Sequence, residues 1–300
     1  MSRREVYFLI GVDFDSIAGW IGSYGGQDSA GDIQQGIFAA EVGVKRLLNL
    51  LKKYNLESTW FCPGLSIESF PETVRDIFSS GHEIGAHGYS HEDPRKLSVE
   101  QEKGVFNKSI ELIKDVTGSS PKGFVAPYWE MTEQTSKLLL KFGFRYDHSQ
   151  FHRDFEPYFM RIRERWSKID YGKPSEEWMK PLDKGKTVDI VEIPASWYLD
   201  DITPLMFIKN FSNTFGFIPA SEVMAMWYSQ FQWMLKSVES EFRVFTITLH
   251  PDASGRSHVI TELDKLIARI TSVPKVINLN FYEFSEIFRK VSRNNSGDSK

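Results

Sequence analysis

The chain has 300 residues, of which 41% are apolar, with a formal net charge of −4 and a single cysteine, Cys62. No basic stripe is present, which argues against nucleic acid or an anionic membrane surface as a partner, and no apolar run reaches the ~18 residues of a membrane span. The N-terminus lacks a small-residue cleavage site, and one cysteine cannot form an internal disulfide, so we expect a soluble protein of the cytoplasm.

Short apolar runs alternate along the chain with stretches of helical spacing. Residues 6–12 predict a strand covered on both faces, and a glycine-rich loop, long enough to be functional, is expected from 18 to 36. Further strands are expected at 58–62, 82–86, 122–126, 145–147, 188–193, 244–249 and 276–279. Helices are expected at 41–54, 73–80, 98–118, 133–141, 260–270 and 282–291. Because parallel neighbours need crossover connections, this alternation predicts an α/β fold, a distorted (β/α) barrel of about seven parallel strands.

Two segments do not fit the alternation. Residues 150–187 and 196–235 are rich in aromatic side chains, which makes disorder a poor interpretation. We expect both to be insertions in a single catalytic domain of residues 1–291. They would cap the barrel mouth or bury their rings against another subunit, which predicts a homo-oligomer. Residues 292–300 are polar and are expected to be a disordered tail.

Polar side chains follow directly on several of the expected strands. Asp13 and Asp15 come after the first strand, His87 after the third, Tyr128 after the fourth and His250 after the seventh. In a β/α barrel the carboxyl ends of the strands converge on one rim, where active sites are built. The sequence therefore predicts one site at that rim, composed of these residues.

The stretch from 82 to 93 holds three histidines, and two of them, His87 and His91, are four residues apart next to small residues. That spacing allows both imidazoles to bind one metal ion, and zinc takes neutral imidazole readily. Two such ligands need a third from elsewhere in the chain. The aspartates at 13 and 15 are the candidates, so a metal site is expected.

These motifs resemble the polysaccharide deacetylase family, which includes chitin and peptidoglycan deacetylases. Asp13 and Asp15 occupy the place of the family's paired aspartates, and residues 87–91 match its His-x-x-x-His motif. Residues 126–128 resemble its third motif, and residues 248–250 its last. The resemblance implies a distorted barrel, a divalent metal ion that is usually zinc, and a set of site residues. By role these are the metal ligands Asp15, His87 and His91, the general base Asp13, the general acid His250, and Tyr128, Trp129 and Glu130 at the oxyanion and the substrate.

Two departures from the family pattern limit the resemblance. The third motif of the family usually begins with an arginine that orients the base carboxylate, and Val125 stands in that place here. The first motif reads Asp-Phe-Asp at residues 13–15, where the family has adjacent aspartates. Both features indicate an offshoot subfamily, one that includes cytoplasmic hydrolases of small cyclic amides, so the substrate does not follow from the family name.

We predict a metal-dependent amide hydrolase that removes the acetyl group from an N-acetylglucosamine-containing glycan or precursor. Hydrolysis of cyclic imides or ureides is the alternative. A haloacid-dehalogenase-type phosphatase, with residues 200–201 as its metal-binding acids, and an iron(II) oxygenase are further alternatives, as is a sugar-binding protein without activity. The phosphatase interpretation gives His87, His91 and His250 no role. Cys62 is interpreted as structural, and His148 and His152 as surface or cap residues.

Overall fold

The computed structural model describes residues 5–209, 214 and 216–297. One curled sheet has the strand order β6-β7-β5-β4-β3-β2-β1-β8, with β9 paired to β1. The strands are β1 (Val6–Asp13), β2 (Thr59–Cys62), β3 (Glu83–Ala86), β4 (Gly123–Phe124), β5 (Tyr146–Asp147), β6 (Tyr158–Ile162), β7 (Lys186–Glu192), β8 (Arg243–Leu249) and β9 (Val276–Asn278). From β7 through to β8 neighbouring strands are parallel, and β6 joins β7 antiparallel. The expected distorted barrel is confirmed.

The two ends of the sheet meet through irregular segments, so the barrel is only partly closed. Val244 of β8 donates its N–H to Phe155 O at 3.0 Å, just before β6. Asp200, which follows β7 along the chain, forms an isolated parallel bridge with Thr248 of β8. The bridge brings the segment after β7 against the carboxyl end of β8, where His250 follows.

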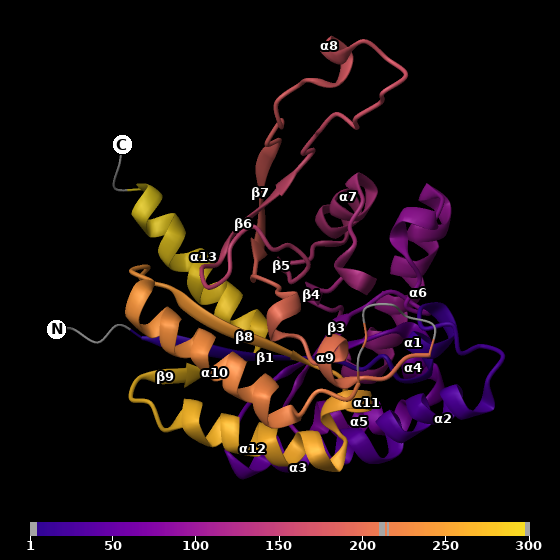
Figure 1. Cartoon of the computed structure of the whole chain (residues 1–300), viewed down its shortest axis with the longest axis vertical. Helices are drawn as coiled ribbons and strands as arrows, with labels where there is room; N and C mark the ends of the chain where they lie inside the picture. Colours follow the sequence, from indigo (N-terminus) through magenta and orange to yellow (C-terminus); the bar gives the residue numbers. More distant parts are fainter. Residues whose placement is uncertain (1–4, 210–213, 215, 298–300) are drawn as a thin grey trace.

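Helices pack around the sheet, with α3, α5, α10 and α12 along its lower side in Figure 1. They are α1 (Ser16–Gly22), α2 (Ala30–Phe38), α3 (Val44–Lys53), α4 (Gly64–Ser69), α5 (Pro71–Ser79), α6 (Val99–Thr117), α7 (Glu133–Phe142), α8 (Ser175–Trp178), α9 (Ile202–Leu205), α10 (Ala220–Ser237), α11 (Pro251–Ser254), α12 (Ser257–Thr271) and α13 (Phe281–Gly297). A π-helical segment, Ala39–Gly43, precedes α3, and 3₁₀ turns span Pro94–Lys96, Pro127–Trp129 and Trp197–Leu199. In the described part of the chain, no helix is both long and apolar enough to cross a membrane.

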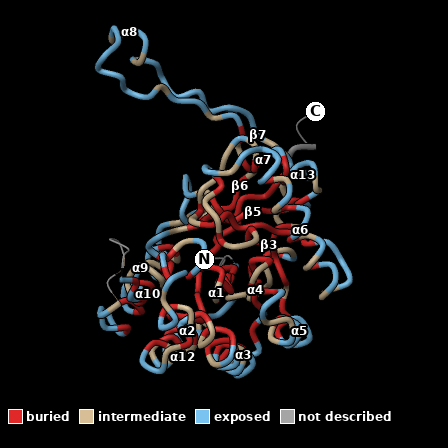
Figure 2. Tube along the Cα trace, turned by 90° about the vertical axis from the view of Figure 1, so that its right-hand side faces the viewer, coloured by how far each residue is buried: buried red, intermediate tan, exposed pale blue. Residues whose placement is uncertain are grey.

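Strand β1 is buried along its whole length because it separates two parts of the core. Its side chains alternate between the two faces of the sheet. Phe8 and Ile10 belong to the large apolar cluster shared with the outer helices, whereas Leu9 belongs to a second cluster with Phe281 and Phe284 of α13. Helix α13 thus fills the inner face of the curled sheet, and Figure 2 shows the resulting buried centre in red. A strand covered on both faces explains the continuous apolar run at 6–12.

The glycine-rich stretch at 18–36 is largely helical, where a loop was expected. Helices α1 and α2 pack closely: the Ser16 hydroxyl donates to Gly36 O at 2.9 Å, and a Cβ on Gly36 would lie 2.6 Å from the backbone of Ile17. This glycine therefore serves close helix packing, not loop flexibility. At the other end of the chain, α13 continues to Gly297, so residues 292–297 extend a helix; residues 298–300 lie outside the described residues.

The two aromatic-rich segments take different forms. Residues 150–187 contain β6, α8 and the start of β7, and the far end of the β6–β7 hairpin projects well away from the body and carries α8 (Figures 1 and 2). None of the described residues from 163 to 187 is buried. The described part of 196–235 instead packs on the body, where α10 buries Trp227 and Phe231 in the main core.

Candidate metal and acid–base site

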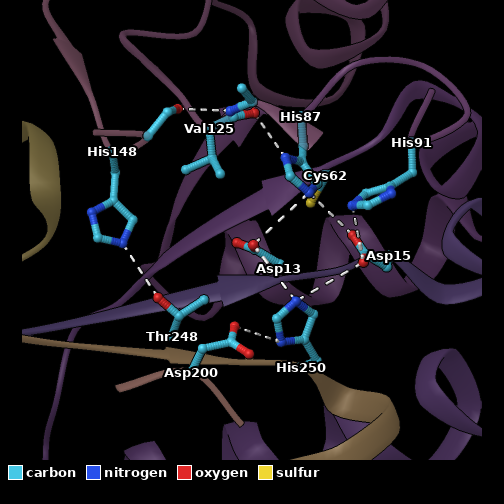
Figure 3. A network of polar contacts seen from close by, with 12 residues as sticks. Asp13, Asp15, Cys62, His87, His91, Val125, His148, Asp200, Thr248 and His250 are labelled. Atoms are coloured by element: carbon cyan, nitrogen blue, oxygen red, sulfur yellow. Dashed lines mark hydrogen bonds and ion pairs between the residues drawn. The ribbon is translucent and has the colours of Figure 1, made fainter. Parts of the chain in front are cut away.

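The carboxyl ends of the parallel strands surround one pocket of about 360 Å³. Asp13 ends β1, His87 follows β3 and His250 follows β8, and Figure 3 shows Asp13 lying between the two imidazoles. The structure thus brings together residues that are up to 237 positions apart, as the barrel rule predicts. Other lining residues include His91, Tyr24, Tyr128, Trp129 and Trp197.

Asp15, His87 and His91 form a compact group of buried ligand atoms. Asp15 Oδ1 lies 3.2 Å from His87 Nε2, and Asp15 Oδ2 lies 3.4 Å from His91 Nε2. One ligand atom from each residue falls within 4.8 Å of the others. His87 Nε2 and Asp15 Oδ1 are buried without a hydrogen-bond partner in the described part of the chain. Unpaired buried polar atoms are costly, so this cluster fits a divalent cation that would bind them.

The hydrogen bonds of both histidines leave Nε2 as the metal-facing atom. His87 Nδ1–H donates to Val125 O at 2.8 Å, because a carbonyl oxygen can only accept. The Ser23 hydroxyl donates to His91 O at 2.7 Å and therefore accepts from His91 Nδ1–H. Burial lowers the pKa of His91 to about 4, so this ring is neutral, as a metal ligand must be.

The carboxylates near His87 raise the pKa of that ring, which is the opposite of the effect of burial. Burial lowers the pKa of His87, but Asp13 and Asp15 outweigh it and leave the pKa raised. The carboxylates that stabilise a proton on His87 would also stabilise a metal cation beside it. Two imidazoles and one carboxylate make a donor set typical of zinc.

Asp13 is placed to exchange a proton beside this group. Its Oδ2 lies 3.8 Å from His87 Nε2 and 3.6 Å from His250 Nε2, while Oδ1 is buried without a hydrogen-bond partner in the described residues. Burial raises the pKa of Asp13 to about 6, against the lowering effect of the two histidines. A general base works best with a pKa close to the working pH, and burial moves the pKa of Asp13 towards neutrality.

Val125, at the position of the family arginine, packs its side chain into the inner core with Phe61 and Trp129. Its backbone takes part in the site, since its carbonyl orients His87. The described residues bring no arginine to Asp13. Among the described residues, Asp13 forms ion pairs only with the imidazoles of His87 and His250.

His250 is held by a carboxylate that the sequence motifs did not identify. Asp201 Oδ1 accepts from His250 Nδ1 at 2.7 Å, and both Asp201 oxygens accept from the His250 backbone N–H, at 3.0 and 2.9 Å. Ser254 also donates to Asp201 Oδ2. Burial lowers the pKa of His250, but Asp201, Asp200 and Asp13 outweigh it and raise the pKa well above its ordinary value. A histidine that stays protonated is suited to act as a general acid.

Asp200, Asp201 and His250 form a second group with metal-ligand spacing. Both Asp201 oxygens already accept hydrogen bonds, unlike the unpaired atoms of the Asp15 group. This second group therefore fits the orientation of His250 better than the binding of a cation. The pairing with His250 engages Asp201, one of the two acids to which the phosphatase interpretation gave a metal-binding role.

The loop after β4 carries two consecutive residues in the left-handed region, Tyr128 at φ 58° and Trp129 at φ 54°. Such backbone is uncommon outside glycine and needs external support. The Ser149 hydroxyl accepts from Ala126 N–H at 2.9 Å and so holds the start of the loop. Tyr128 and Trp129 line the pocket as expected, whereas Glu130 is not among the lining residues and instead pairs with Arg95 at 2.8 Å.

Aromatic rings form much of the pocket wall. Trp129 and Trp197 pack edge to face at a centroid distance of 4.6 Å. Tyr24 lies beside His91, with ring centroids 5.9 Å apart, and donates its hydroxyl to Asp15 Oδ2 at 2.6 Å. Neither Tyr24 nor Ser23 was identified from the sequence, because both belong to the stretch that was expected to be a loop.

Two other sequence interpretations have different outcomes. Cys62 is fully buried and burial raises the pKa of its thiol, which agrees with a structural role. His148 was expected to be a surface or cap residue but is buried, with Nδ1–H donating to Ile193 O at 2.7 Å and Nε2 3.3 Å from Thr248 Oγ1. His152, four residues further on, is exposed as expected.

Comparison with known proteins gives consistent results. The model of the polysaccharide deacetylase family matches residues 36–146. A peptidoglycan deacetylase of Helicobacter pylori is 50% identical over 287 residues, which cover 96% of this chain and 97% of the relative. A peptidoglycan deacetylase-like protein of Gibberella zeae is 38% identical, covering 89% and 81%. The crystal structure of a polysaccharide deacetylase-type protein from Mycobacterium smegmatis superposes with a TM-score of 0.81 at 27% identity, covering 97% and 92%.

Proposed function

The chain belongs to the polysaccharide deacetylase family, and from that premise we propose that it hydrolyses the N-acetyl amide of an N-acetylglucosamine-containing glycan. Asp15, His87 and His91 would hold the divalent metal ion, which we propose to be zinc. The observation that carries the proposal is the position of Asp13. Its carboxylate lies within 4 Å of both a metal-ligand imidazole and the imidazole of His250.

When bound, the cation would supply Lewis acidity toward the acyl carbonyl and toward the attacking water. The residues of the chain provide the proton transfers. Asp13 takes a proton from the water, and His250, kept protonated by Asp201, gives one to the leaving nitrogen. Each such step contributes on the order of 10²–10⁴ in rate. The backbone N–H of Tyr128 would bind the oxyanion, as the family resemblance implies.

The substrate class rests on the relatives and on the pocket. The Helicobacter pylori protein named a peptidoglycan deacetylase is similar along nearly its whole length. The same pocket also favours a second candidate, hydrolysis of small cyclic imides or ureides, because its walls are aromatic rings such as those of Tyr24, Trp129 and Trp197. Apolar walls on several sides suit a small ligand.

The two candidates are separated by their products. Zinc-loaded protein would be offered N-acetylated chito-oligosaccharides of increasing length and, in parallel, a series of cyclic imides. Deacetylation predicts acetate release from the oligosaccharides and no ring opening of the imides. Ring opening of the imides without acetate release from any oligosaccharide would replace the deacetylase assignment by the second candidate.

We also propose that the protein is a homo-oligomer. The projecting part of the hairpin, residues 163–187, buries no residue, so within one chain no burial offsets the entropy cost of ordering its backbone. Its exposed large apolar side chains are Trp166, Ile169, Tyr171, Met179 and Leu182. A second copy of the chain would cover them. Sedimentation equilibrium of the full chain tests this: a monomer at 100 µM, or an oligomer unaffected by Trp166→Ser with Tyr171→Ser, would refute the proposal. A location in the cytoplasm stays a prediction, which cell fractionation would test.

A further inference from the structure

Two consecutive residues at the end of α1 contact two of the three metal ligands. The Tyr24 hydroxyl donates to Asp15 Oδ2 at 2.6 Å, and the Ser23 hydroxyl bonds both the carbonyl and the Nδ1–H of His91. We propose that Ser23 and Tyr24 are positioning residues that fix Asp15 and His91 in the geometry needed to bind the metal ion. The inference rests on the proposed metal-dependent function and names residues that the family motifs do not contain.

The backbone of the pair is anchored to α1, the helix that begins directly after Asp15. The N–H groups of Ser23 and Tyr24 both donate to Gly19 O, at 2.9 and 2.8 Å. At the other end of this short helix, Ala18 N–H donates to Asp15 O at 2.9 Å. Because α1 is only one short helix, Tyr24 after its end lies close to Asp15 before its start, and the Tyr24 hydroxyl reaches the Asp15 carboxylate.

The end of α1 also lies directly against the loop that carries His91. A Cβ on Gly22 would lie 1.8 Å from Ser90 O, so the backbones are in contact and only glycine fits. His91 itself is held at φ 56°, a left-handed conformation that is unfavourable without support. The bond from the Ser23 hydroxyl to His91 O supplies such support next to the ring.

The arrangement has a specific consequence for each ligand. A serine oxygen that accepts from Nδ1–H fixes the tautomer of His91 and leaves Nε2 for the metal ion. A phenol that donates to one oxygen of Asp15 orients the carboxylate and leaves Oδ1, which has no partner in the described residues, for the cation. Loss of such outer contacts typically weakens metal binding about 10- to 100-fold.

The experiment compares zinc affinities of the full-length protein by competition with a chromophoric chelator. Tyr24→Phe and Ser23→Ala are each expected to raise the zinc Kd about 10- to 100-fold, while the Tm of the metal-free protein stays within a few degrees of wild type. Tyr54→Phe is a matched control, because it removes a hydroxyl that donates to Asp264 far from the site. Ser285→Ala, which removes a buried hydroxyl that donates to Tyr282 O, is the control for Ser23.

The outcomes separate this inference from the proposed activity. A zinc Kd within threefold of wild type in Tyr24→Phe and Ser23→Ala would overturn the positioning role, whatever the activity. Equal losses in the Tyr54 and Ser285 controls would overturn it as well, since the effect would not be specific to the site. Weakened zinc binding in the two site variants, combined with no acetate release by the wild type, would support the positioning role and refute the deacetylase function.

Discussion

Replacing Asp201 by asparagine would keep the shape of the side chain and remove its charge. The carboxylate is fully buried and accepts from His250 Nδ1–H at 2.7 Å and from the His250 backbone N–H at 3.0 and 2.9 Å. Each hydrogen bond to a charged group is worth about 1.5–3 kcal/mol. If losing the Nδ1 bond removes this energy from the transition state for proton donation, kcat falls roughly 10- to 150-fold, because about 1.36 kcal/mol corresponds to a factor of ten.

The pH dependence of kcat gives an independent test of the role of Asp201. The pKa of His250 lies above its ordinary value because Asp201, Asp200 and Asp13 outweigh the effect of burial. The general acid must be protonated, so activity is present below this pKa and is lost as the pH rises through it. Asp201→Asn lowers the pKa and moves the alkaline limb of the kcat profile to lower pH. Metal content should not change, since Asp201 is not in the Asp15 group.

Asp200→Asn is the matched control, because its carboxylate lies 3.8 Å from His250 Nδ1, beyond hydrogen-bonding distance. Its effect on kcat should be smaller than that of Asp201→Asn. Steady-state acetate release between pH 5 and 10 measures both variants. Wild-type kcat with an unmoved alkaline limb in Asp201→Asn, or a larger loss in Asp200→Asn, would refute the reasoning.

Three further predictions follow from the site. His91→Ala should lose bound zinc and acetate release together, and a variant with full zinc content and activity would remove His91 from the ligand set. Asp13→Asn should keep its zinc and lose on the order of 10²–10⁴ in kcat, whereas loss of zinc with an intact fold would make Asp13 a ligand. Ser149→Ala leaves Ala126 N–H without its hydroxyl partner, so chemical denaturation should show that the free energy of unfolding falls by about 1–3 kcal/mol. The value of kcat should fall by a larger factor than KM rises, and an unchanged kcat would contradict a role of Ser149 in holding the oxyanion loop.

Features that depend on neighbouring residues were predictable from the sequence. The run at 6–12 became β1, and the helix expected at 98–118 became α6, where Ser98 and Gln101 form a capping box with both hydrogen bonds present. The order of polar residues after strands placed Asp13, His87 and His250 at one rim, because parallel strands end on the same side.

Features that depend on tertiary pairing were not predictable in this way. Asp201 orients a histidine 49 residues further along the chain, and only the meeting of the ends of the sheet makes them neighbours. His148 lies in a charged stretch that resembles surface, yet Ile193 O and Thr248 give its ring buried partners. Ser23 was hidden in a glycine-rich stretch whose glycines serve close contact between backbones.

The most direct test of the account is acetate release as a function of zinc equivalents, measured on metal-free protein with an N-acetylated chito-oligosaccharide. One site composed of Asp15, His87 and His91 predicts that release rises linearly and reaches its plateau at one zinc ion per chain. Chelation should abolish the activity, and added zinc should restore it. Acetate release that is equally fast without metal, or the absence of release at full zinc occupancy, would contradict the proposed function.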